Sequence, residues 1–296
     1  MGINGKDLQL LLYLQERGHV RRGSKIIEIG AQQLSNEFLR SESLVRSFRA
    51  QLGANLAYSM PAPTPVVIGP GDAELLKAEA PFARDFWISL GFDYTAIDVD
   101  GSPETIPLDL NFDSIPETLR KKFDLVTNFG TTEHICNQLN AFKAIHDLAA
   151  PGGVMIHHLP AGGSLNHGLF NYNMKFFWHL ARSNEYNWLY ANYYGSENSY
   201  TIPDNIRDFV SIYEPEGISK TEGMKTSDYA ILIAYQKHLD IPFVPPIDVN
   251  TGTKTDNANL NQRYWTVFKP ELLSLVTSSG LSTERELAQL LNRRTD

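Results

Sequence analysis

The sequence has few of the features that mark secreted or membrane proteins. Cys136 is the single cysteine among 296 residues, which excludes an intrachain disulfide and any metal site with several thiolate ligands. No apolar run is long enough to span a bilayer, and the segment up to Gly18 lacks the basic region, apolar core and cleavage site of a secretory leader. We therefore expect a protein of the reducing cytoplasm.

Positive charge is also scarce. The chain carries 26 Lys and Arg residues against 34 Asp and Glu residues, so its formal net charge is −8. A net negative protein is repelled by a phosphate backbone, which disfavours a nucleic-acid partner. With 42% hydrophobic residues, the chain is long enough to bury one large core and still carry a lid or a small subdomain. We expect one domain over residues 1–296.

Short apolar runs alternate with helix-like periodicity along most of the chain. The expected strands, each bounded by glycine, proline or polar turn residues, are 24–30, 92–98, 106–111, 123–127, 154–159, 188–194 and 228–236. The expected helices are 6–18, 41–51, 81–90, 115–121, 137–149, 176–183 and a segment from 270 onward. This order predicts an α/β, doubly wound, Rossmann-like fold with a mostly parallel seven-stranded sheet and helices on both faces.

Four segments lie outside the simple alternation. We expect an N-terminal helix within residues 1–20, substrate-side loops and a helix in 164–227, and a helical extension in 262–296. Residues 31–80 are rich in proline, which resists both helix and central strand. An insertion after the first strand hangs over the ligand-binding edge of such a sheet, so we expect a lid; a surface decoration and an oligomer contact are the alternatives.

The most informative segment is residues 122–163, KFDLVTNFGTTEHICNQLNAFKAIHDLAAPGGVMIHHLPAGG. Its pattern predicts a strand, a polar turn, a helix, a Pro-Gly-Gly stop and a second strand. The polar turn, residues 128–134, would lie where open α/β sheets bind their ligands. This turn is therefore expected to border the functional site.

The order of motifs over residues 24–240 resembles the class I S-adenosylmethionine-dependent methyltransferases, especially those that act on small molecules. The motifs follow the predicted strands in turn and are EIG, AIDVD, LDLN, FDLVTNFGTTEH and PGGVMIHHLP, with HGLFNYNMKFFWHLARSNEY after the fifth. The resemblance implies S-adenosyl-L-methionine as cofactor and O-methylation of a polar small molecule such as a sugar or secondary metabolite. The negative net charge and the lack of a long apolar run predict no nucleic-acid or membrane partner, and both are compatible with a homodimer.

The resemblance also implies which residues hold the cofactor. Gly30 would let the first turn approach the methionine part, while Glu28 would orient that turn or reach the ammonium group. Asp98 would accept hydrogen bonds from the ribose hydroxyls, with Asp100 as the rival if the strand runs two residues longer. The other expected contacts are Asp109 and Leu110 beside the adenine, unless Asp109 is only a solvated turn residue, and Asn128, Phe129 and Gly130 beside the methionine.

An oxygen acceptor must lose a proton, and histidines are the available near-neutral bases. His167, among polar and aromatic residues after the fifth strand, ranks first, followed by His134 and His158 as further catalytic candidates. His157 must point to the opposite face from His158, so at most one of that pair faces the acceptor. The expected acceptor contacts are Gln32, Gln33 and Tyr172. No compact spacing of Asp, Glu and His stands out, so no metal site is predicted.

Two departures from the family pattern leave alternatives open. The first turn, residues 30–33, has one glycine where several are usual, which leaves a noncatalytic module that has lost the cofactor as one alternative. A nicotinamide oxidoreductase of the same fold is the other alternative, although the Gly-x-Gly-x-x-Gly pattern is missing. Gly30 and Asp98 also lie much further apart than the about 20 residues expected, which identifies 31–80 as an insertion.

Overall fold

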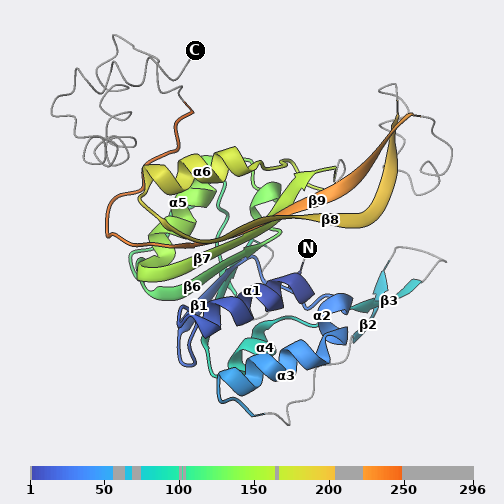
Figure 1. Ribbon diagram of the computed structural model, residues 1–296, viewed down its shortest axis with the longest axis horizontal. Coiled ribbons are helices and arrows are strands. Elements are labelled where there is room, and N and C mark those ends of the chain that lie inside the picture. The colour runs from blue at the N-terminus through green and yellow to red at the C-terminus, as the bar shows by residue number, and fades with distance from the viewer. Residues whose placement is uncertain are drawn as a thin grey trace, which may run out of the picture.

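A seven-stranded sheet with helices on both faces forms the centre of the protein (Figure 1). The computed structural model describes residues 2–55, 64–68, 75–99, 102, 105–163, 167–203 and 223–248. The expected helical extension of 262–296, the rival acid Asp100 and parts of the 31–80 and 164–227 segments lie outside the described residues.

The sheet has the strand order β5-β4-β1-β6-β7-β9-β8. Its strands, in chain order, are β1 (Lys25–Ile29), β4 (Asp93–Asp98), β5 (Ile106–Pro107), β6 (Phe123–Phe129), β7 (Ala149–Gly162), β8 (Asn187–Pro203) and β9 (Gly223–Gln236). The pairs from β5 to β7 are parallel, whereas β9 runs antiparallel to both β7 and β8. The expected α/β fold with seven strands is confirmed, and the antiparallel β9 makes the sheet mixed.

Two groups of helices cover the two faces of the sheet. Figure 1 shows α5 (Gln138–Leu148) and α6 (Met174–Ser183) on one side. The other side carries α1 (Gly5–Glu16), α2 (Asn36–Arg40), α3 (Glu42–Gln51) and α4 (Arg84–Ser89). Neighbouring strand residues alternate between the two cores: Ile26 packs on the α1 side and Ile27 on the α5 side.

The first helix is fixed at its start by a capping box. The Asn4 side chain accepts hydrogen bonds from the backbone N–H groups of Lys6 and Asp7, and Asp7 Oδ2 accepts one from the Asn4 N–H at 2.8 Å. These bonds satisfy donors that a helix otherwise leaves open at its N-terminus. They also hold Asp7 beneath the sheet, where it is fully buried.

The 31–80 insertion is closed at its base by backbone contacts. Gln33 forms an isolated bridge with Phe82, and Leu34 N–H donates to the Pro81 carbonyl at 2.8 Å. Inside this loop, α2 and α3 bury Phe38 and Phe48 in the α1-side core. The hairpin of β2 (Thr64–Ile68) and β3 (Leu75–Glu79) forms a separate two-stranded sheet. The helical part of the insertion is therefore a packed layer of the domain.

The segment 115–121, expected as a helix, forms turns instead. The backbone N–H groups of Leu119 and Arg120 donate to carbonyls three residues earlier, as in turns and not as in an α-helix. The Arg120 side chain also donates a hydrogen bond to the Ile115 carbonyl at 3.1 Å. Lys121 then has a φ of 55°, which ends a right-handed segment. The strand β5 is also shorter than the expected 106–111: the Leu108 N–H still donates to the Asp98 carbonyl at 3.0 Å, and the Asp109 side chain then accepts hydrogen bonds from Asn111 in a local turn.

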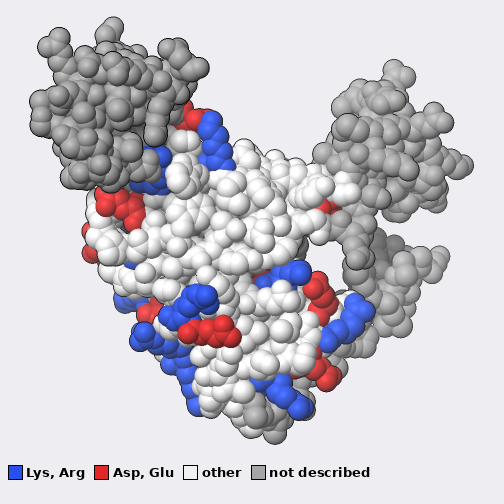
Figure 2. Space-filling view, in the orientation of Figure 1, with Lys and Arg blue, Asp and Glu red and all other residues white. Residues whose placement is uncertain are grey.

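Charged side chains are mixed in sign on the face that Figure 2 views. Lys and Arg lie among Asp and Glu over the lower half, where Figure 1 places α1 to α3, and the upper half carries fewer charges. Within the described residues, no helix has both the length and the apolar composition that a membrane crossing requires.

Candidate functional site

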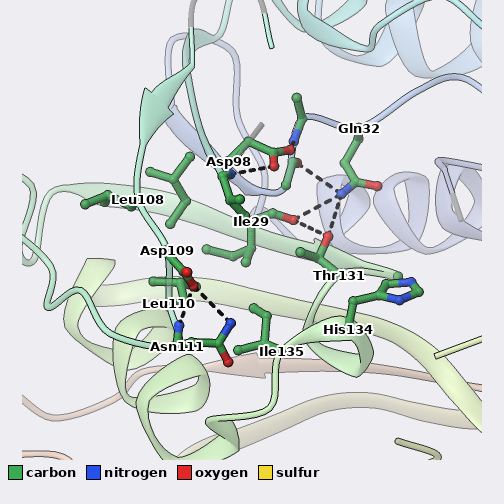
Figure 3. A pocket seen from close by; sticks show the side chains of 15 residues that line it. Ile29, Gln32, Asp98, Leu108, Asp109, Leu110, Asn111, Thr131, His134 and Ile135 are labelled. Atoms are coloured by element: carbon green, nitrogen blue, oxygen red, sulfur yellow. Dashed lines mark hydrogen bonds between the residues drawn. The ribbon is translucent and has the colours of Figure 1, made fainter. Parts of the chain in front are cut away.

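A cavity of about 300 Å³ lies at the carboxyl ends of β1, β4 and β6 (Figure 3). This is the point where the chain order of the sheet reverses between β1 and β6, at which open α/β sheets bind ligands. The residues that line the cavity are Ile29, Gly30, Ala31, Gln32, Ile97, Asp98, Val99, Leu108, Asp109, Leu110, Asn111, Gly130, Thr131, His134 and Ile135.

The turn after β1 is held in an unusual backbone conformation by its neighbours. Gly30 has a φ of 77°, and a Cβ there would lie 2.4 Å from Thr131 Oγ1. The Gln32 side-chain amide donates to the carbonyls of Ile29 and Gly30 and to Thr131 Oγ1, each at 3.1 Å. Among the residues that the structure describes, Gln32 Oε1 is buried and has no hydrogen-bond partner.

Glu28 supports the turn from behind. Its carboxylate accepts hydrogen bonds from the Gln32 N–H at 3.0 Å, from Trp87 Nε1 at 2.7 Å and from the Tyr94 hydroxyl at 2.8 Å. Glu28 is fully buried and does not line the cavity. Of the two roles left open by the sequence, these contacts favour orientation of the turn.

The ionisation of Glu28 is expected to make stability depend on pH. Burial raises the pKa of Glu28 to about 7, although hydrogen bonds from Gln32, Tyr94 and Trp87 oppose the shift. A raised carboxyl pKa stabilises the fold below the ordinary value of 4.5, and that contribution is lost as pH rises through about 7. As pH rises from 4.5 to about 7, the free energy of unfolding in urea should fall by roughly 1–3 kcal/mol more for the wild type than for Glu28→Gln. Parallel pH curves for the two proteins would contradict this expectation.

Two acids face the cavity from the neighbouring strands. Asp98 accepts hydrogen bonds from the backbone N–H groups of Ala31 and Val99, each at 2.7 Å, and so ties the end of β4 to the first turn. Asp109 accepts hydrogen bonds from the Asn111 backbone and side chain. Figure 3 shows both acids on one side of the cavity and His134 on the other. Ile97, Leu108 and Leu110 are among the apolar residues of the lining.

Asn128 and Phe129 do not line the cavity, unlike Gly130. The strand β6 runs two residues further than the sequence suggested, pairing Asn128 with His157 and Phe129 with His158. Asn128 instead holds the next turn. Its Oδ1 accepts a hydrogen bond from the Thr132 N–H at 3.2 Å, and its Nδ2 donates to the Thr132 hydroxyl at 2.9 Å. Continued sheet pairing therefore overrides the polar composition that predicted a turn here.

The residues Thr132–His134 form a separate 3₁₀ turn, η1, and not the first turn of the next helix. The helix α5 begins only at Gln138, with the Asn137 side chain capping it. In η1, Glu133 is fully buried while His134 is exposed at the cavity rim. Burial lowers the pKa of His134, although the charge of Glu133 opposes this shift.

Glu133, His134 and His167 form one cluster, which we call the Glu-His-His cluster. Glu133 Oε1 lies 3.3 Å from His167 Nε2 and 3.8 Å from His134 Nε2, and the two imidazole rings are 5.1 Å apart. The structure thus brings together two of the expected catalytic histidines. Glu133 was not assigned to the site from the sequence. The feature that could have indicated it is the ionisable Thr-Glu-His run directly after a buried strand.

The loop that carries His167 is attached to Glu133 through the backbone. The N–H groups of Leu169 and Phe170 donate to the Glu133 carbonyl at 2.8 and 3.2 Å. A Cβ on Gly168 would lie 2.8 Å from Glu133 Cγ, so the close approach depends on glycine. These contacts fix His167 relative to the Glu133 carboxylate.

Tyr172 supports this arrangement from within the core and does not face the cavity. It is 6% exposed, and its hydroxyl donates to Gln138 Oε1 at 2.6 Å and lies 3.2 Å from the Thr132 hydroxyl. Burial raises the pKa of Tyr172 well above its ordinary value. Gln33, which was also expected to contact the methyl-accepting substrate, does not line the cavity either. Its backbone carbonyl accepts a hydrogen bond from the Ile3 N–H at 2.8 Å.

His157 and His158 point to opposite faces of β7, as the strand geometry requires, and neither lines the cavity. His157 packs between Phe142 and Phe177, and burial lowers its pKa to about 3. His158 is 4% exposed and forms an ion pair with Asp7 at 2.7 Å. The structure therefore separates His158 from His134 and His167.

Comparison with known proteins identifies the family. A family model described as a methyltransferase domain matches residues 55–210, more than half of the chain. The chain belongs to this methyltransferase family. The resemblance to class I S-adenosylmethionine-dependent methyltransferases is thus confirmed, and S-adenosylmethionine is the cofactor of this enzyme. The match begins after β1, so the Gly30 turn lies outside it.

Solved structures show more distant likeness to this methyltransferase. A protein from Bacillus halodurans described as a candidate methyltransferase has a TM-score of 0.43 at 9% identity, covering 79% of this chain and 99% of its own. A Burkholderia thailandensis 1,6-didemethyltoxoflavin N1-methyltransferase has a TM-score of 0.38 at 11% identity, with coverages of 78% and 77%. An S-adenosylmethionine-dependent methyltransferase from Archaeoglobus fulgidus has a TM-score of 0.38 at 10% identity, covering 78% of this chain and 94% of its own. No curated protein matches the sequence.

Proposed function

We propose that this methyltransferase methylates a hydroxyl oxygen of a polar small molecule, such as a sugar or secondary metabolite. The observation that supports an oxygen acceptor is the Glu-His-His cluster beside the cavity, because a hydroxyl must lose its proton as it attacks. The nicotinamide oxidoreductase alternative finds no support in the family match.

The residues around the cavity fit S-adenosylmethionine. We assign Asp98 to the ribose hydroxyls and Asp109 to the adenine, whose ring would lie against Leu110 and its apolar neighbours. We assign Gln32 Oε1, which has no hydrogen-bond partner in the described part of the chain, to the ammonium group of the methionine part. Gly30 and Gly130 line the cavity between the ends of β1 and β6, where we place the methionine part.

When bound, S-adenosylmethionine supplies a methyl group activated by the sulfonium, and S-adenosylhomocysteine remains after transfer. The protein holds the acceptor oxygen in line with the breaking carbon–sulfur bond while the new carbon–oxygen bond forms. The acceptor proton leaves toward the Glu-His-His cluster, which we assign to the acceptor side because His134 lies on the cavity rim. His158 is too deeply buried to meet an acceptor and is proposed to have a structural role.

Other parts of the proposal concern the surroundings of the site. The lid role of 31–80 stays a proposal, and no described residue from Leu34 to Asn55 lines the cavity. A small-molecule acceptor without nucleic acid, a cytoplasmic location and a homodimer likewise remain proposals.

Formation of S-adenosylhomocysteine with a panel of polyols, sugars, phenols, amines and thiols tests the acceptor class. We expect turnover with hydroxyl compounds, and an about 100-fold loss of turnover in His167→Ala with unchanged S-adenosylhomocysteine affinity. His238→Ala, which changes an exposed histidine outside the cluster, is the matched control. Turnover confined to amines or thiols, or a fully active His167→Ala enzyme, would overturn the proposal of oxygen methylation.

A further inference from the structure

We propose that Glu133, His134 and His167 bind a divalent transition-metal ion that receives the acceptor hydroxyl. One carboxylate oxygen and two imidazole nitrogens lie within 4.8 Å of one another in this cluster. The inference deepens the proposed function and rests on it for the identity of the acceptor. The cation site itself follows from the contacts of these three residues.

The first argument is the state of the Glu133 carboxylate. The side chain is fully buried, and within the described part of the chain neither of its oxygens receives a hydrogen bond. A buried carboxylate without hydrogen bonds is costly unless a cation or a proton compensates it. Among the described residues, the basic groups within 4 Å of this carboxylate are the two imidazoles of the cluster, and imidazole is a common metal ligand.

The second argument is the rigid attachment of the three ligands. Glu133 and His134 are adjacent in η1, and the backbone bonds from Leu169 and Phe170 hold the His167 loop against Glu133. The imidazoles are partly exposed, with side-chain exposures of 48% for His134 and 35% for His167. Small rotations of these rings would bring their nitrogens to metal–ligand distances of about 2.1 Å around one ion.

The third argument is the place of the cluster beside the cofactor cavity. His134 contributes both to the cluster and to the cavity lining, so an ion bound there lies next to the methyl-transfer site. Three protein ligands leave coordination positions open, as catalytic metal sites require. An acceptor hydroxyl in an open position would lose its proton to solvent water more readily, because a cation lowers the pKa of the oxygen it binds; with the ion bound, the two imidazoles would serve as ligands and would not take the proton themselves.

The ligand set also selects the class of ion. Two imidazoles and one carboxylate suit Zn²⁺, Fe²⁺, Co²⁺ or Mn²⁺, whereas Mg²⁺ and Ca²⁺ prefer sites made of oxygen ligands. Co²⁺ is the informative probe, because its visible absorption reports the number and type of ligands. Cys136, the single cysteine, is not among the cluster ligands, so no thiolate-to-cobalt charge-transfer band is expected.

Titration of chelator-treated full-length protein with Co²⁺ and Zn²⁺, followed by calorimetry and visible absorption, tests the site. We expect one ion per chain, and an about 100-fold weaker affinity in both His134→Ala and His167→Ala. Glu133→Gln should lose Co²⁺ and Zn²⁺ affinity to the same extent. If this substitution of a buried residue prevents folding, the two histidine variants still test the site. His238→Ala should bind Co²⁺ as the wild type does.

Absence of Co²⁺ and Zn²⁺ binding, or binding that is equal in the wild type and all three cluster variants, would overturn the metal site. S-adenosylhomocysteine affinity and methyl transfer are measured on the same samples. Full transfer by the chelator-treated enzyme refutes the metal proposal and leaves the oxygen methyltransferase standing. Metal binding without transfer to any hydroxyl compound leaves the ion site standing and refutes the proposed function.

Discussion

The Asp98→Ala protein should bind S-adenosylhomocysteine at least about 100-fold more weakly than the wild type. Two hydrogen bonds from ribose hydroxyls to a carboxylate contribute about 1.5–3 kcal/mol each. The substitution also releases the Ala31 N–H from Asp98, which loosens the turn that approaches the methionine part. Isothermal titration calorimetry with S-adenosylhomocysteine measures the change directly.

Two controls separate cofactor binding from folding in this experiment. Asp93→Ala removes an acid from the same strand, but its side chain is 66% exposed and pairs with the exposed Lys25 at 3.9 Å, so affinity should not change. Circular dichroism should give the same helix and strand content for all proteins. Unchanged affinity in a folded Asp98→Ala protein would show that the cofactor is held elsewhere.

Loss of the buried pair between Asp7 and His158 should have the largest effect on stability. Asp7 is fully buried and serves two elements, since Oδ2 caps α1 and Oδ1 lies 2.7 Å from His158 Nδ1. Removing one member of a buried pair leaves the other charge without compensation and costs about 3–5 kcal/mol. We expect the free energy of unfolding in urea to fall by this amount in Asp7→Ala. In the control variant Asp85→Ala, which breaks the exposed pair with Arg84, it should fall by at most about 1 kcal/mol.

The same pair should give stability a characteristic pH dependence. Burial lowers the pKa of His158, but the charge and hydrogen bond of Asp7 outweigh burial, so the net pKa is raised. The pair therefore stabilises the fold fully below the unfolded pKa of about 6.5, and this contribution is lost as pH rises through the folded pKa. His158→Gln should remove this decline in a pH series of unfolding experiments. An identical decline in the variant would assign it to another group.

Several local predictions succeeded because the information lay in short stretches of sequence. The runs that became β1 and β4 are apolar, β-branched and ended by turn residues, so their boundaries were close to those found. Gly30 and Asp98 follow those strands, and the parallel pairing brings both into one cavity. The nonhelical segment 115–121 was predicted wrongly, because side-chain bonds to its backbone do not appear in periodicity.

By itself, the sequence determined the α/β class, the methyltransferase resemblance and the strand ends that border the cavity, because these follow from apolar periodicity and from motifs read in chain order. Only the tertiary structure decided what the ionisable residues face. It buried His158 against Asp7 from a distant helix, drew Asn128 and Phe129 into the sheet, and placed Glu133 beside His167. Burial and ion pairing depend on contacts between segments far apart in the chain, which no local pattern encodes.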